Sequence, residues 1–159
     1  LMDHIAEEFG KHFNMDEVTM ILTAEASGIA LSAIVAHHFH KPMIFAKKAK
    51  SDNIEGGLYQ SDIFSYTYKK KVTLLVSKEW LSADDKVLII DDFMANGEAM
   101  RGLCEIVNAA GATLVGIGCA VEKGFQGGGD RLRAAGVNLK SLAIIESAEP
   151  GNIVFRGED

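Results

Sequence analysis

Short apolar runs alternate along this chain with stretches in which apolar residues recur every three or four positions. The recurring stretches predict helices, and the continuous runs, rich in β-branched residues, predict strands. The predicted helices cover residues 2–13, 29–39 and 97–110, and a further short helix ends at residue 135. The predicted strands cover residues 18–22, 43–46, 63–68, 72–76, 87–90, 113–121, 139–145 and 153–155. This alternation predicts an α/β fold with a central, mostly parallel sheet flanked by helices.

The run VLII at residues 87–90 is apolar at every position. A strand without polar alternation suits a parallel strand covered on both faces, so we expect it in the middle of the sheet. Ligands of open α/β sheets bind beyond the carboxyl ends of the strands. We therefore expect functional residues directly after strands. Residues 49–61, AKSDNIEGGLYQS, have mixed charge and no period, which predicts a mobile loop that carries function.

Composition and charge narrow the class of protein. The 159 residues, 48% of them hydrophobic, suffice for one compact domain over residues 1–159. The net charge of -6 disfavours a nucleic-acid partner, and no apolar run reaches the roughly 18 residues of a membrane span. Cys104 and Cys119 are not in C-x-x-C spacing, which predicts free thiols in a reducing cytoplasm.

Two adjacent acids, Asp91 and Asp92, follow the strand at 87–90 and precede the turn FMANGEA at 93–99. Carboxylates at a strand end can accept hydrogen bonds from the vicinal hydroxyls of a ribose. The free N–H groups at the start of the next helix form an anion site. Because the two acids and the anion site are adjacent, the hydroxyls and the phosphate that they bind would belong to one sugar, a 5-phosphoribosyl group. The alternative is that the two acids only cap a turn.

The order of four apolar residues, two acids, two apolar residues and a small-residue loop resembles the phosphoribosyl-diphosphate signature of the type I phosphoribosyltransferases. The segment DDFMANGEA, followed by AGATLVGIGCAVEKGFQ at 110–126, is similar to the sequences of the subgroup that uses xanthine. The resemblance covers nearly the whole chain and implies the type I phosphoribosyltransferase fold, with a flexible loop or hairpin and a small N-terminal hood. Because the chain opens on Leu1 rather than Met, we expect the hood segment to be missing.

This resemblance implies that the 5-phosphoribosyl group passes from phosphoribosyl diphosphate to an oxopurine, giving the nucleoside 5'-monophosphate and pyrophosphate. Asp91 and Asp92 would hold the ribose hydroxyls as positive charge develops at the anomeric carbon. Mg²⁺ would bind through the substrate, with Asp91 as a further candidate ligand, and the resemblance also implies a homodimer. The residues expected to hold the 5-phosphate are Ala95, Asn96, Gly97, Glu98 and Ala99. Those expected to hold the pyrophosphate are Ala26, Ser27, Gly28, Lys47 and Lys48.

The base would be recognised by Lys123 and Phe125. A lysine offers only hydrogen-bond donors, which suits the 6-oxo group of xanthine, guanine or hypoxanthine and opposes the 6-amino group of adenine. Phe125 is expected to stack on the purine, with core packing as the alternative. The preference for xanthine depends on the resemblance alone. For Lys47 and Lys48 the alternative is a solvated pair of charges.

Several features remain open or are interpreted structurally. Glu98 would repel a phosphate, so we expect its side chain to point to solvent or to a cation. We expect His37, His38 and His40 to complement a helix C-terminus rather than bind metal. The run Gly127–Gly129 is expected only to turn the chain before a helix. A non-catalytic purine-operon repressor on the same fold, which binds phosphoribosyl diphosphate, remains the alternative function.

Overall fold

The computed structural model describes residues 1–49, 57–65 and 70–157. Its helices are α1 (Met2–His12), α2 (Gly28–His38), α3 (Glu98–Ala109) and α4 (Gly128–Ala134), with a short 3₁₀ helix η1 (Gly124–Gln126). Its strands are β1 (Met20–Ala24), β2 (Met43–Ala49), β3 (Leu58–Ser65), β4 (Lys70–Ser77), β5 (Lys86–Met94), β6 (Thr113–Lys123), β7 (Leu139–Glu149) and β8 (Asn152–Phe155).

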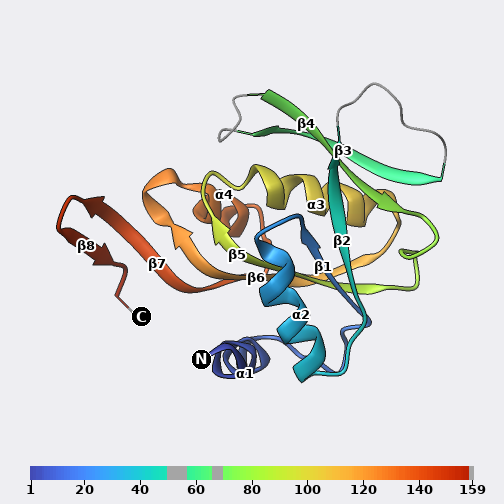
Figure 1. The fold of residues 1–159 in the computed structure, drawn as a ribbon, viewed down its shortest axis with the longest axis horizontal. Helices are drawn as coiled ribbons and strands as arrows, with labels where there is room; N and C mark the ends of the chain where they lie inside the picture. Colours follow the sequence, from blue (N-terminus) through green and yellow to red (C-terminus); the bar gives the residue numbers. More distant parts are fainter. Residues whose placement is uncertain (50–56, 66–69, 158–159) are drawn as a thin grey trace.

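In the described part of the chain, the eight strands form one sheet in the order β3-β4-β2-β1-β5-β6-β7-β8 (Figure 1). The central strands β2, β1, β5, β6 and β7 are parallel. The outer strands β3, β4 and β8 join antiparallel at the two ends. The predicted α/β fold with a mostly parallel sheet is confirmed. As expected, β5 lies inside the sheet, between β1 and β6.

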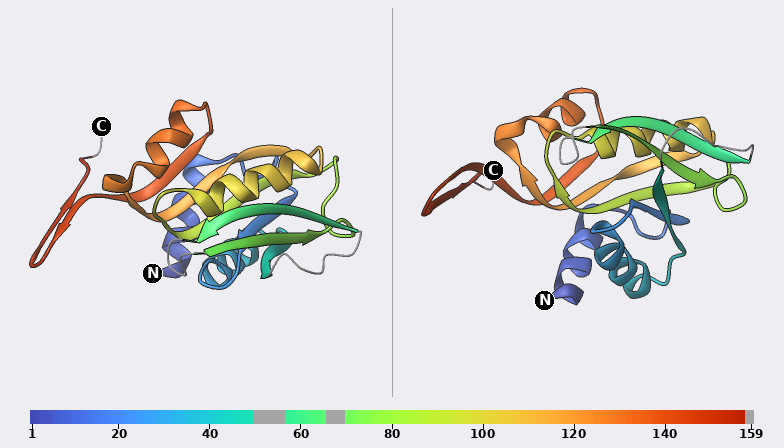
Figure 2. Two further views of the ribbon diagram at one scale, coloured as in Figure 1. Left: turned by 90° about the horizontal axis from the view of Figure 1, so that it is seen from above. Right: turned by 45° about the horizontal axis from the view of Figure 1, so that its top comes forward.

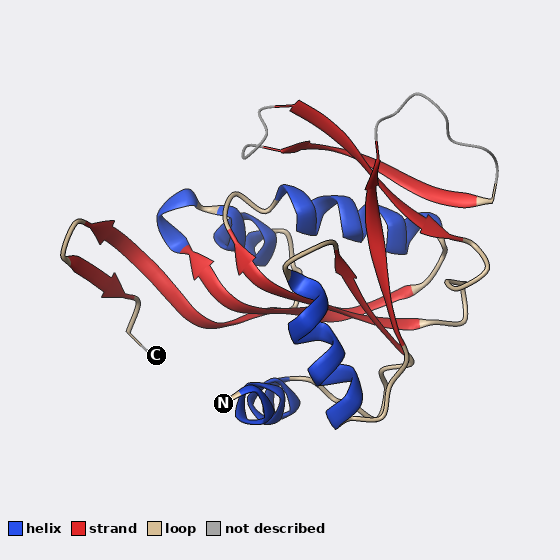
Figure 3. Cartoon of the chain, in the orientation of Figure 1, coloured by secondary structure: helices blue, strands red, loops and turns tan. Residues whose placement is uncertain are grey.

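Two hydrophobic clusters lie on opposite faces of the sheet. Leu88 and Ile90 face the helices α1 and α2, whereas Val87 and Ile89 face α3 and the β3–β4 hairpin. All four side chains have no exposed surface. The layers are visible in Figure 2, and Figure 3 separates helices from strands by colour. The uniformly apolar sequence of β5 is therefore explained by burial on both faces.

The strands β2, β5 and β7 are longer than predicted, and β3 begins in a segment that was predicted as a loop. β3 begins at Leu58, so residues 58–61 belong to a strand and not to the predicted loop. The inward-facing position Ser61 is polar yet buried, because its hydroxyl donates a hydrogen bond to Glu105 on α3 at 2.5 Å. This polar residue in a core position hides the alternation typical of a strand. The prediction of loop motion falls on residues 50–56, which lie outside the described residues.

No helix in the described part of the chain is long and apolar enough to cross a membrane. Cys104 is half-buried and Cys119 is buried, and both are free thiols. Burial raises the pKa of the Cys104 thiol to about 11.

Candidate active site

A cavity of about 210 Å³ lies at the carboxyl end of β5, where the chain turns into α3. This is the edge of the sheet at which ligand sites of α/β folds are found. Its walls come from the loop after β1, from β2, β3 and β5, and from the first residues of α3. The lining residues are Ser27, Lys48, Ile63, Phe64, Asp91, Phe93, Met94, Ala95, Asn96, Gly97, Glu98, Ala99 and Met100.

The structure brings most of the predicted residues for phosphoribosyl diphosphate to this one cavity. Lys48 lines it, but Lys47 does not, because successive residues of β2 point to opposite faces. Lys47 instead lines a separate apolar groove with Phe45 and Trp80. The two predicted pyrophosphate lysines are therefore separated by the sheet.

The acid pair lies within the last residues of β5 rather than beyond its end. Asp91 is 7% exposed, and its Oδ1 accepts a hydrogen bond from the backbone N–H of Asp92 at 3.0 Å. Burial, followed by the negative charge of Asp92, raises the pKa of the Asp91 carboxyl to about 7, while the positive charge of Lys48 opposes the shift. Near neutral pH, the Asp91 carboxyl is therefore divided between its protonated and charged forms.

The turn from β5 into α3 presents backbone donors to the cavity. Gly97 precedes α3 with φ of +82°, in the left-handed region that favours glycine, and no side chain caps the helix there. The first N–H groups of a helix have no partner within the helix. Together with the positive end of the helix dipole, they form an anion site at the residues predicted to hold the 5-phosphate.

The loop between β1 and α2 is tied to its neighbours by two side chains. Ser27 Oγ donates a hydrogen bond to Asp92 Oδ1 at 2.9 Å, and Glu25 Oε1 accepts one from the backbone N–H of Lys48 at 2.5 Å. The Glu25–Ala26 peptide bond is cis. These contacts fix the predicted pyrophosphate loop against both β5 and β2.

Gly28 allows this loop to approach the acid pair. A Cβ atom at position 28 would lie 2.5 Å from Asp91 Oδ1 and 2.3 Å from Thr23 Oγ1. The Thr23 hydroxyl has no exposed surface and no hydrogen-bond partner in the described structure. Only a residue without a side chain fits between these two oxygen atoms.

Glu98 lines the cavity, and its charge is balanced. Its Oε2 lies 3.0 Å from Nη2 of Arg101 and accepts a hydrogen bond from the backbone N–H of Phe64 on β3 at 3.3 Å. The hydrogen bond from Arg101 holds the pKa of the Glu98 carboxyl below its ordinary value. The expected cation partner is confirmed, although the residue remains part of the cavity wall.

Neither of the two predicted base-binding residues lines this cavity. Lys123 ends β6, and its ammonium lies 5.0 Å from the ring centre of Phe93, which lines the cavity. Phe125 in η1 is 51% exposed, so the alternative of core packing is wrong. Phe93, 44% exposed, is an aromatic residue that sequence reasoning missed. Its position directly after the acid pair was the available signal.

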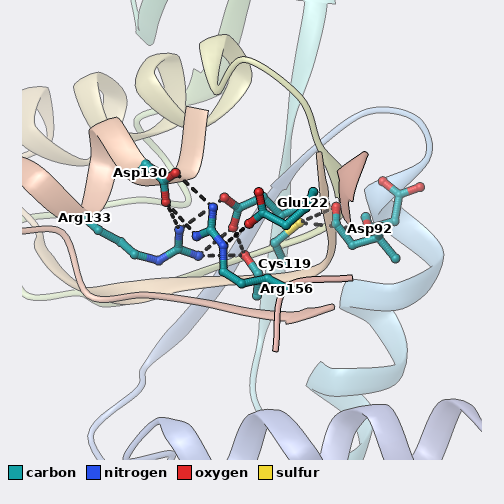
Figure 4. A network of polar contacts seen from close by, with 9 residues as sticks. Asp92, Cys119, Glu122, Asp130, Arg133 and Arg156 are labelled. Atoms are coloured by element: carbon teal, nitrogen blue, oxygen red, sulfur yellow. Dashed lines mark hydrogen bonds and ion pairs between the residues drawn. The ribbon is translucent and has the colours of Figure 1, made fainter. Parts of the chain in front are cut away.

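A network of ion pairs supports β6 next to Lys123 (Figure 4). The fully buried carboxylate of Glu122 accepts hydrogen bonds from both terminal nitrogens of Arg133, at 3.1 and 2.5 Å. Arg133 also pairs with Asp130, which in turn receives two hydrogen bonds from Arg156, at 2.9 and 3.1 Å. The network connects α4 with β6 and with the segment that follows β8.

The described residues contain no group of three or more His, Cys, Asp or Glu side chains placed to hold a metal ion.

Comparison with known proteins agrees with the fold. Residues 1–136 match the family profile described as a phosphoribosyl transferase domain, and the chain belongs to that family. It is 52% identical to a xanthine phosphoribosyltransferase of Bifidobacterium animalis subsp. lactis, over 98% of this chain and 82% of that protein. A xanthine phosphoribosyltransferase of Lachnoclostridium phytofermentans is 50% identical, over 99% of this chain and 82% of the relative.

Among solved structures, adenine phosphoribosyltransferase from Giardia lamblia, in complex with 9-deazaadenine, superposes with a TM-score of 0.79. The superposition covers 92% of this chain and 80% of that chain at 24% sequence identity, and it shows a shared fold.

Proposed function

We propose that this protein is a purine salvage enzyme that transfers the 5-phosphoribosyl group from phosphoribosyl diphosphate to xanthine. The observation that carries the proposal is that Asp91 and the loop Ala95–Ala99 line one cavity. A cavity that combines the Asp91 carboxyl with the backbone amides of this loop suits a sugar with free hydroxyls and a 5-phosphate. The names of the relatives support xanthine as the base.

In this proposal the acid pair acts on the ribose. Asp91 and Asp92 accept hydrogen bonds from the two ribose hydroxyls, and their negative charge favours the positive charge that develops at the anomeric carbon as pyrophosphate leaves. A base nitrogen, which gives up its proton to solvent, forms the new bond to that carbon while the bond to the pyrophosphate oxygen breaks and its electron pair leaves with pyrophosphate. Positive charge near Asp91 lowers the pKa of its carboxyl, so the site favours the charged carboxylate as the transition state forms.

The two ends of the sugar are held by backbone groups. The amides of residues 95–99 bind the 5-phosphate, and the loop at Ala26–Gly28 binds the pyrophosphate. Lys48 lines the cavity and neutralises part of the departing charge. Lys47 lies on the other side of β2 and has no such part in the proposal.

The base is placed by residues at the ends of β5 and β6. The Lys123 ammonium, near the exposed ring of Phe93, donates to the 6-oxo group of the purine. Phe125 offers a second exposed aromatic face. A donor without acceptors opposes the 6-amino group of adenine, and a buried polar mismatch of this kind discriminates by about 10⁴-fold or more.

Mg²⁺ is part of the proposal through the substrate. Magnesium prefers oxygen ligands and binds through one or two carboxylates together with substrate phosphates. Asp91, an oxygen donor next to Lys48 and Ser27, fits this donor set and is the candidate protein ligand. The ion would neutralise charge on the diphosphate and so make pyrophosphate a better leaving group.

The proposal extends to a cytoplasmic homodimer. Two free cysteines, one half-buried and one buried, suit a reducing compartment. The non-catalytic repressor is the competing function, and no observation on the described residues favours it.

The test is to mix the purified protein with phosphoribosyl diphosphate, Mg²⁺ and one base at a time. Xanthine, guanine, hypoxanthine and adenine are compared by the formation of nucleoside monophosphate. We expect turnover with xanthine and none with adenine. A mock purification from host cells without the expressed protein, run in parallel, measures activity from contaminating host enzyme. Tight binding of phosphoribosyl diphosphate without turnover of any base would favour the repressor instead.

A further inference from the structure

Arg131 on α4 reaches two loops that follow different strands. Its Nη2 donates a hydrogen bond to the carbonyl oxygen of Asn96 at 2.9 Å, and its Nη1 donates one to the carbonyl oxygen of Gln126 at 3.5 Å. Asn96 belongs to the proposed 5-phosphate loop after β5, and Gln126 belongs to η1 after β6. The two contacts hold the guanidinium between these loops.

The first turn of α4 lies directly on the same loop. A Cβ atom at Gly128 would lie 2.5 Å from the carbonyl oxygen of Ala95, 2.5 Å from the carbonyl carbon of Asn96 and 2.7 Å from the nitrogen of Gly97. The helix therefore contacts the loop through bare backbone at Gly128 and through a charged side chain one turn later. Gly127, with φ of +71°, turns the chain as predicted, whereas Gly128 and Gly129 belong to the helix.

The bond from Arg131 acts on the peptide group that joins Asn96 to Gly97. In a planar trans peptide, the carbonyl oxygen and the next N–H point in opposite directions. A guanidinium that holds the oxygen of Asn96 on the α4 side therefore directs the N–H of Gly97 to the other side. Both residues line the cavity.

The orientation of this peptide matters because the loop is poor in side-chain donors. Positions 95 and 99 are alanines without a hydroxyl group, Glu98 is an acceptor paired with Arg101, and Asn96 supplies the one side-chain amide of the loop. Backbone N–H groups must therefore supply most of the hydrogen bonds to a phosphate, and a peptide turned the other way would present its oxygen to the anion.

We propose that Arg131 is a positioning residue that fixes the Asn96–Gly97 peptide for binding the 5-phosphate. It acts from the far side of the loop and does not touch the substrate. This inference rests on the proposed function, because it assumes that the loop binds a phosphate ester. It goes beyond the family signature, since Arg131 lies 35 residues after Asn96, outside the acid pair and its loop.

The test compares ligand binding to the wild-type protein and to Arg131→Gln by titration calorimetry. The probes are ribose 5-phosphate, which engages the loop, and pyrophosphate, which does not. Because hydrogen bonds to charged groups contribute more than neutral ones, we expect Arg131→Gln to weaken ribose 5-phosphate about 10- to 100-fold. Pyrophosphate should bind as before. Arg131→Lys keeps one charged donor and should fall between the two proteins.

Arg156→Gln is the matched control. Arg156 is also paired near α4, with Asp130 and Glu146, but it has no bond to the 5-phosphate loop. We expect both probes to bind this variant with wild-type affinity. Gly128→Ala supplies a second test variant that displaces the same loop from the same helix, and it should show the same selective loss of ribose 5-phosphate.

The outcomes separate the inference from the function on which it rests. Wild-type affinity of Arg131→Gln for ribose 5-phosphate would overturn the inference and leave the proposed function intact. An equal loss of both probes with a lowered melting temperature would also overturn it, since that result indicates general damage to the fold. Ribose 5-phosphate that fails to bind even the wild-type protein would overturn the proposed function and the inference together.

Discussion

Gly28→Ala tests whether the pyrophosphate loop and the acid pair must touch. An added Cβ atom would lie 2.5 Å from Asp91 Oδ1, about 0.9 Å short of the 3.4 Å at which ordinary contact begins. The contact with Thr23 Oγ1, at 2.3 Å, is tighter. Both side chains are short, lie on strands and are buried, so neither can swing aside. The loop or the carboxylate must move by several tenths of an ångström or more.

The magnitude follows from two opposing effects. Overpacking of a dense interior costs about 1–3 kcal/mol, whereas replacing Gly by Ala in a helix returns roughly 0.5–1 kcal/mol. We expect the free energy of unfolding to fall by about 1–2 kcal/mol. At roughly 2–4 °C per kcal/mol for a chain of this size, the melting temperature should fall by about 2–8 °C. Catalysis should suffer more, since a misplacement of about 1 Å can cost 100-fold in rate.

The assay combines steady-state kinetics with xanthine and a urea unfolding curve. Gly157→Ala is the control, because a Cβ atom there meets nothing within 4 Å. This control should keep wild-type activity and stability within about 0.5 kcal/mol. Wild-type kcat in Gly28→Ala would refute the claim that the position requires glycine to keep Asp91 in place.

Three further predictions concern the acids and the buried ion pair. Asp92→Asn should lower kcat at least 100-fold. The fold should stay near normal, because the amide oxygen can still accept the hydrogen bond from Ser27. Unchanged turnover would remove Asp92 from the mechanism. Arg133→Leu leaves the fully buried Glu122 carboxylate without its ion partner. The free energy of unfolding measured in urea should therefore fall by about 3 kcal/mol or more, and a fall of less than about 1 kcal/mol would contradict this. Because the pKa of Asp91 is raised, the folded protein keeps a proton that the unfolded chain releases above the ordinary pKa of 3.8. This group therefore lowers the free energy of unfolding as the pH rises from about 4 to 7. The free energy of unfolding of Asp91→Asn should therefore rise relative to that of the wild type between pH 5 and pH 8. A difference between the two proteins that stays constant over this range would show that Asp91 titrates normally.

The central strands could be predicted from the sequence because burial and periodicity agree there. β5 is apolar at four successive positions, and the structure buries all four side chains on alternating faces. The start of β3 was missed because the buried position Ser61 is polar, and its partner Glu105 is distant in sequence. A local pattern does not reveal a partner on another element.

The residues of the candidate site also fall into two groups, those that a local sequence pattern reveals and those that depend on contacts between distant elements. The acid pair and its loop form one continuous segment, so their spacing in the sequence is enough to indicate the cavity. The separation of Lys47 from Lys48 follows from the alternation of a strand and was available from the sequence. The contacts of Gly128 and Arg131 with the 5-phosphate loop were not, because they depend on how α4 docks against a turn about 30 residues earlier.

The hydrogen bond between Ser27 and Asp92 has a consequence for selectivity. These two groups satisfy one another, so a ligand that engages only one of them must first break an existing bond and binds more weakly than a ligand that engages both. A molecule that carries ring hydroxyls next to an anionic leaving group can compensate both partners at once. The site thus discriminates against fragments such as free ribose, which would otherwise occupy it without being consumed.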